Sequence, residues 1–206
     1  MPSVFLYSDP HFGHQGVCKF MRNDGVTKLR PWDTAEEMDE HLVKVYNERV
    51  KPNDKIYFLG DVAINRKALA TVLRLNGDKV LIRGNHDIFK DSDYTDIGFR
   101  SLRSYHVMNG MILSHIPVHE ASLGRFGKNI HGHLHANQVM KARGVDARSG
   151  KVLYSETEID PRYVCVCVEQ LPDFAPILFE DLLKNIKQRD IDLGFKDDRE
   201  SIMGLG

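Results

Sequence analysis

Five short predicted strands of this chain each end in Asp, Asn or His, and this repeated arrangement constrains the fold and its chemistry together. The first three strands are unbroken apolar runs, which is typical of strands covered on both faces of a sheet. Gly, Pro and polar residues follow each run at once, so each strand ends in a loop. The predicted strands lie at residues 4–7, 55–59, 79–83, 110–115 and 128–133.

Helical patterns separate the first three strands. Thr34 and Glu37 have the spacing of a capping box, and apolar residues at helical spacing follow until the helix stops before Pro52. A second helix is predicted over 67–73. Alternating strands and helices predict the α/β class with a mostly parallel sheet.

The rest of the chain completes one domain. A last strand is predicted over 163–168 and a closing helix over 179–189, so the domain is expected to span residues 1–189. The polar segment 190–206 is expected to be a flexible C-terminal tail.

The polar strand ends are candidate metal ligands. In an open parallel sheet, ligands bind beyond the carboxyl ends of the strands, so these residues should converge at one edge. Each motif alone is equally consistent with a turn or a cap. Carboxylate, amide and imidazole donors together suit borderline divalent ions. The candidates are Asp9, His11, Asp61, Asn85, His115, His133 and His135.

Seven donors are too many for one tetrahedral ion. They suit two ions about 3.5–4 Å apart that share a bridging carboxylate. Asp61 stands alone at its strand end and is the expected bridge.

The series of motifs resembles the calcineurin-like metallophosphoesterases. It reads D-x-H, G-D, G-N-H-D, H and G-H-x-H in order, from Asp9 to His135. The resemblance implies a four-layer α/β/β/α sandwich in a single domain. It also implies two divalent metal ions, Mn first among them, with Fe, Zn, Ni or Co as alternatives.

The resemblance also implies a role for His86 and for each candidate ligand. His86 would contact the phosphate and protonate the leaving oxygen. For Asp87 the resemblance gives no role, and two interpretations stay open: it orients His86 or a ligand, or it caps a helix or turn. Asp9, His11 and His135 would hold one metal, and Asn85, His115 and His133 the other, with Asp61 between them.

Three further residues are candidate substrate contacts. His14 and His119 follow two of the motifs, and Arg125 lies between Gly124 and Gly127 in a segment where a flexible loop would meet a phosphate. The alternative for each is an ordinary loop residue with solvated charge.

The expected function is hydrolysis of a phosphodiester in a nucleotide or small organophosphate, by attack of a hydroxide bridging the two metals. The alternatives are a phosphomonoesterase acting on proteins or small molecules, a nuclease, and an inert binding scaffold. A net charge of −1 argues against a dedicated nucleic-acid-binding or membrane-binding protein, although nucleic acid remains a candidate substrate.

The cysteines and the N-terminus predict a cytoplasmic location. The first residues lack a secretion-signal pattern, and no apolar run approaches the length of a membrane span. Cys18, Cys165 and Cys167 offer no evident disulfide pair, so they are expected to be small apolar side chains in a reducing compartment.

Overall fold

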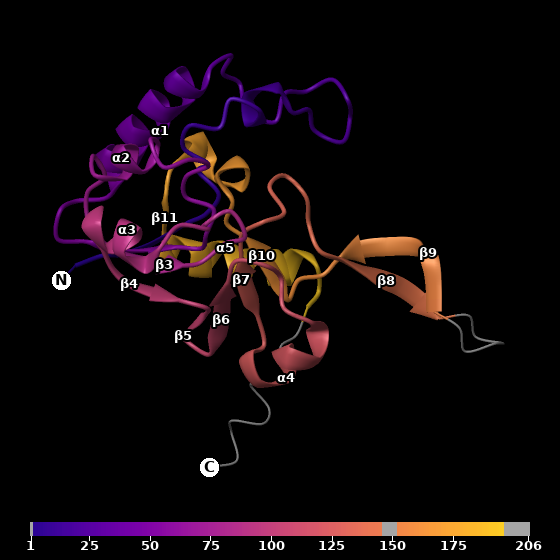
Figure 1. Ribbon diagram of the computed structural model, residues 1–206. Coiled ribbons are helices and arrows are strands. Elements are labelled where there is room, and N and C mark those ends of the chain that lie inside the picture. Colours follow the sequence, from indigo (N-terminus) through magenta and orange to yellow (C-terminus); the bar gives the residue numbers. More distant parts are fainter. Residues whose placement is uncertain (1, 146–151, 196–206) are drawn as a thin grey trace, which may run out of the picture.

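The computed structural model describes residues 2–145 and 152–195, and its strands form two sheets and a separate hairpin (Figure 1). The five-stranded sheet has the order β11-β1-β2-β3-β4, and the four-stranded sheet the order β10-β7-β6-β5. The first sheet contains β1 (Val4–Tyr7), β2 (Lys55–Phe58), β3 (Asp78–Ile82), β4 (Phe99–Arg103) and β11 (Ile177–Leu178). The second contains β5 (His106–Met108), β6 (Met111–Ser114), β7 (Asn129–His131) and β10 (Tyr163–Cys165). The separate hairpin consists of β8 (Met140–Val145) and β9 (Val152–Ile159).

The prediction of one mostly parallel sheet is wrong in the number of sheets. Strands β1 to β4 pair in parallel as expected, but β11 and β4 occupy the two edges of that sheet. The later strands β6, β7 and β10 therefore pair in parallel with one another, and β5 closes their edge antiparallel. The chain is a mixed α/β protein, and the four-layer stacking implied by the resemblance stays a prediction.

Both sheets contribute to one hydrophobic core. Leu6 and Ile56 of the first sheet belong to the same buried cluster as Leu113 and Ile130 of the second. Helix α1 (Ala35–Arg49) buries one face in this cluster, and α5 (Phe179–Asp192) packs against β1. The remaining helices are the short α2 (Leu69–Val72), α3 (Asp91–Asp96) and α4 (Leu123–Phe126).

Helix α1 begins as predicted at Thr34, but only half of the capping box forms. The Thr34 hydroxyl accepts a hydrogen bond from the N–H of Glu37 at 3.1 Å. The Glu37 carboxylate accepts from the N–H of Asp33 at 3.2 Å, one residue before the expected partner. The side chain thus still satisfies a free donor at the start of the helix.

The segment predicted as a strand over 163–168 changes sheet partway. It pairs with β7 until Cys165, and the N–H of Val166 still bonds to the carbonyl of His131. Cys167 then bridges to Ser8 beyond β1, and a 3-10 turn follows at Val168–Gln170. This crossing carries the residues after Cys165 to the carboxyl end of β1.

The end of the chain differs from the predicted boundary. Helix α5 continues to Asp192, beyond the predicted helix end at 189, and residues 196–206 of the predicted tail lie outside the described residues. No helix within the described ranges combines the length and the apolar character that crossing a membrane requires.

Candidate metal centre

The predicted ligands follow the carboxyl ends of β1, β2, β3, β6 and β7 and gather into two groups. Within each group, one potential ligand atom per residue lies within 4.8 Å of the others. We call these sets group one and group two. Group one consists of Asp9, His11 and His135, and group two of Asp61, His115 and His133.

Asp61 lies between the two groups. Its Oδ2 atom is 3.4 Å from Nε2 of His115 in group two and 3.6 Å from Nε2 of His11 in group one. Asn85 joins group two, because its Oδ1 atom is 2.9 Å from the same nitrogen of His115. The geometry therefore brings all seven predicted donors together, with the expected bridging carboxylate in the middle.

Several of these donors are buried without a hydrogen-bond partner. Oδ1 of Asp9 and both ring nitrogens of His11 have none, although the two residues are only 0% and 3% exposed. An unpartnered buried polar group costs about 1–3 kcal/mol, so such groups are rare in folded proteins. Carboxylate and imidazole atoms left in this way fit the ligands of a divalent cation.

The backbone at the ligands is also strained. A non-glycine residue with positive φ is uncommon and costs about 1–3 kcal/mol, and such residues cluster at functional sites. Eight non-glycine residues of the described ranges have positive φ, and five of the eight are candidate ligands. These five are Asp9, His11, Asp61, His133 and His135.

Two glycines of the motifs allow the loops to approach this closely. A Cβ atom at Gly84 would overlap Oδ1 of Asp61, and one at Gly132 would overlap Oδ2 of Asp9 and the hydroxyl of Ser8. The motifs therefore require glycine here for space.

The charges of the two groups depend on one another. Burial lowers the pKa of His115, but the hydrogen bond with Asp61 and the charges of Asp9 and Asp61 outweigh burial and raise it to about 9. Burial raises the pKa of Asp9, but the nearby imidazoles of His11, His115 and His135 bring it well below its usual range. The carboxylates and imidazoles of the two groups therefore stabilise each other's charged forms.

Two histidines have their ring orientation fixed from behind. Nδ1 of His115 donates to the carbonyl of Leu59 at 2.7 Å, and Nδ1 of His135 donates to Oε1 of Glu169 at 3.0 Å. In each ring Nε2 then faces the other residues of its group. This arrangement is typical of histidines that bind metals.

His86 and Asp87 have different surroundings. The His86 side chain is exposed, and its ring centre lies 5.4 Å from that of His11. The Asp87 carboxylate is buried and accepts hydrogen bonds from the backbone N–H groups of Asp61, Val62 and Gly84 at 2.7–3.1 Å. Of the two roles open for Asp87, the contacts match a cap that positions a ligand loop.

Of the three candidate substrate contacts, one lies beside the centre. The ring centre of His14 is 5.6 Å from that of His11, and its Nδ1 accepts from the N–H of Val17. His119 instead accepts from the N–H of Ala121 at the start of a short turn. Arg125 lies on α4 with its guanidinium near Phe126, ahead of the amino end of β7, whereas His133 follows the carboxyl end.

Sequence reasoning missed four residues that surround group one. The cysteines are free and buried as expected, but Sγ of Cys167 also lies 3.1 Å from Oδ2 of Asp9. Ser8 donates to the same oxygen at 2.5 Å. Arg30 and Glu169 form a fully buried ion pair behind the group. None of these residues belongs to a motif, so no local pattern marks them.

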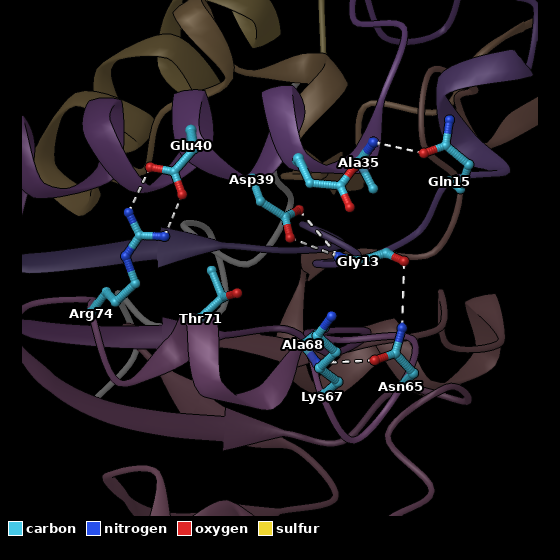
Figure 2. A pocket seen from close by; sticks show the side chains of 11 residues that line it. Gly13, Gln15, Ala35, Asp39, Glu40, Asn65, Lys67, Ala68, Thr71 and Arg74 are labelled. Atoms are coloured by element: carbon cyan, nitrogen blue, oxygen red, sulfur yellow. Dashed lines mark hydrogen bonds and ion pairs between the residues drawn. The ribbon is translucent and has the colours of Figure 1, made fainter.

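A cavity of about 350 Å³ lies beside the loop that follows His11, rather than at the ligands themselves (Figure 2). It is lined by residues of α1 and α2 and of the loop at Gly13. Both carboxylate oxygens of Asp39 accept from the N–H of Gly13 at 3.0–3.1 Å, and burial raises the pKa of Asp39 to about 6. The cavity wall is thus tied to the ligand loop.

The chain is similar to other proteins in sequence and structure. No family model matches it. A solved structure of a protein of unknown function, AQ665 from Aquifex aeolicus, aligns with 89% of this chain and 99% of its own, with a TM-score of 0.54 and 22% identity, which shows a shared fold. The nuclease MPE of Pseudomonas putida aligns with 64% of this chain and 60% of its own, with 23% identity and a TM-score of 0.42, too low to bear on activity.

One relative in sequence is the uncharacterized protein MJ1445 of Methanocaldococcus jannaschii. It is 36% identical over 145 residues, which are 68% of this chain and 73% of the relative. This identity over most of both chains shows common descent, and the chain therefore belongs to the same family as MJ1445.

Proposed function

We propose that this chain is a phosphoester hydrolase that works with two divalent cations, and that it acts on phosphodiesters of nucleotides or small organophosphates. One observation carries the proposal: buried, unpartnered donors of Asp9 and His11 lie beside a second donor group, with Asp61 in reach of both. The order of the motifs, which resembles that of the calcineurin-like metallophosphoesterases, supports the same conclusion.

The seven donors would hold the cations. Asp9, His11 and His135 suit one cation, Asn85, His115 and His133 suit the other, and Asp61 suits both. Two bound cations would supply Lewis acidity for water and for the phosphoryl oxygens. Among divalent ions, Mn is the first candidate, because the set combines carboxylate and imidazole donors without a thiolate from a motif.

The chain's own residues then position the ester and move a proton. His86 is exposed beside His11, so a phosphate held at the two groups would be within its reach. From there, its imidazolium would protonate the leaving oxygen, a contribution of about 10²–10⁴-fold for general acids. The neighbouring His14 presents its Nε2–H, because Nδ1 accepts from Val17, and would donate to a phosphoryl oxygen.

The test is a metal titration combined with an activity assay. The purified chain, stripped with a chelator, should bind two Mn²⁺ per chain in calorimetry. It should then hydrolyse bis-p-nitrophenyl phosphate faster than p-nitrophenyl phosphate. Binding of two ions without turnover of either ester, with Mn, Co, Ni or Zn, would favour the inert scaffold. Faster turnover of the monoester would favour a phosphatase.

A further inference from the structure

A buried ion pair lies directly behind group one. The side chains of Arg30 and Glu169 are both 0% exposed, and Nε of Arg30 donates to Oε1 of Glu169 at 2.8 Å. Buried arginine and glutamate are rare because removing their charges from water is costly, and apolar residues are often as stable in their place. A gain in folding stability is therefore a weak explanation for this pair.

The other donors of Arg30 hold the loop that carries two ligands. Nη2 donates to the carbonyl of Asp9 at 2.5 Å, and Nη1 donates to the carbonyl of Pro10 at 2.6 Å. On the other side of the loop, the N–H groups of Asp9 and His11 bond to the carbonyls of Gly60 and Asp61. The loop has left-handed φ at both ligands, so it needs contacts of this kind to keep its shape.

The Glu169 carboxylate connects the same arginine to the third ligand. Its Oε1 atom accepts from Arg30 and also from Nδ1 of His135, at 3.0 Å. With Nδ1 held by Glu169, Nε2 is the ring nitrogen that faces group one, and it lies 4.0 Å from Oδ1 of Asp9. A single carboxylate oxygen thus links the ligand loop after β1 with the histidine after β7.

We propose that Arg30 and Glu169 are positioning residues for group one. Arg30 sets the distance between Asp9 and His11 by holding their loop, and Glu169 sets the tautomer and the direction of the His135 ring. Partners of this kind typically change metal affinity about 10–100-fold. The inference rests on the proposed metal binding, and it predicts that one of the two sites depends on this pair.

The test removes the pair without leaving a buried charge. The double variant Arg30→Met with Glu169→Leu should fold, because apolar side chains replace both charges. Its first Mn²⁺ should bind as in the wild-type chain, whereas the second should bind about 10–100-fold more weakly in calorimetry. In contrast, Glu169→Gln should keep near-normal affinity, because the amide oxygen still accepts from Arg30 and His135.

A matched control removes another largely buried ion pair. Lys128→Met with Asp190→Leu deletes a pair at the amino end of β7, and both Mn²⁺ ions should bind unchanged. Equal loss of affinity in this control would show a general effect of core charges and would overturn the inference. Wild-type affinity for both Mn²⁺ ions in the Arg30/Glu169 variant would also overturn the inference. A wild-type chain that binds no Mn²⁺ would refute the proposed function itself.

A measurement on the wild-type chain does not depend on any variant folding. In ¹⁵N NMR of the metal-free protein, recorded at a pH where the ring is neutral, the His135 ring should be in the Nδ1–H tautomer, with its signal assigned by its loss in His135→Asn. The Nε2–H tautomer would contradict the inference, because Glu169 would then have no proton to accept.

Discussion

Group one and group two are supported in different ways. Group one is held by side chains from outside the motifs: Arg30 and Glu169 from behind, with Cys167 and Ser8 against Asp9. Group two is held mainly by backbone: the carbonyl of Leu59 fixes His115, and the N–H of His86 donates to Oδ1 of Asp61 at 2.8 Å.

The difference shows where each half of the centre is encoded. The contacts of group two come from residues within or next to the motifs, including the Asp87 carboxylate. Those of group one come from Ser8 before the first motif, from a buried arginine before α1 and from the segment that crosses between the sheets. One half is therefore supported mainly by residues of the motifs and their neighbours, and the other mainly by residues outside the motifs.

The largest effect should come from the residue that both groups share. Asp61→Asn removes the negative charge between them, so both Mn²⁺ ions should be lost in calorimetry and turnover should fall to background. Asp9→Asn, within group one, should lose one ion and keep the other. The exposed Asp33→Asn is the control with the same charge change. Two ions retained in Asp61→Asn would contradict the bridge.

His86→Ala tests proton donation to the leaving oxygen separately from metal binding by either group. Turnover of bis-p-nitrophenyl phosphate should fall about 10²–10⁴-fold while both ions stay bound, because His86 contributes a proton rather than a ligand. His41→Ala, a histidine of α1 that packs on Trp32, should keep the wild-type rate. An unchanged rate in His86→Ala would remove this residue from the mechanism.

Asp87→Asn is the counterpart of the Arg30/Glu169 variant for group two. The amide would place an N–H against backbone N–H groups, so the loop at Asp61 should shift and one Mn²⁺ should bind about 10–100-fold more weakly. Asp160→Asn, another buried carboxylate, is the control and should bind both ions normally. If Asp87→Asn weakened neither ion, support of group two by this residue would be disproved.

The smallest effect is a pH dependence at Asp39, which holds the loop after His11. Burial raises the pKa of Asp39 in the folded chain to about 6, from an ordinary value of 3.8. As the pH rises, this carboxyl therefore ionises earlier in the unfolded chain than in the folded one. The stability that protonated Asp39 contributes is fully present below pH 3.8 and is lost as the pH rises through 6. The loss should be about 1 kcal/mol for this partly exposed group.

Asp39→Asn should remove this decline. Its free energy of unfolding should be measured with denaturant between pH 4 and 7. Over this range, the difference from the wild-type value should shift in favour of the variant by about 1 kcal/mol. Glu48→Gln, an exposed residue of the same helix, makes the same change in formal charge and should leave the decline in place. If the free energy of unfolding changed with pH in the same way in the wild type and in Asp39→Asn, the raised pKa of Asp39 would be contradicted.

The sequence predicted the strands that bear the ligands and the convergence of all seven donors. Strand ends are readable because apolar runs and the turns after them are local patterns, as at Asp61 and His133. The second sheet was not predictable in the same way, since pairing of β6 with β7 and β10 depends on which sheet edges are free. Arg30 and Glu169 are 139 positions apart, and only folding brings them together.

The segment from Tyr163 to Gln170 helps to place the candidate metal ligands where the two sheets meet. Its first half pairs with β7 and its second half reaches the end of β1, where Glu169 contacts His135. A cation held by group one would therefore fasten the sheets to each other as well as prepare a site. At a concentration 100 times its Kd, such an ion would add about 2.7 kcal/mol to the stability of the domain.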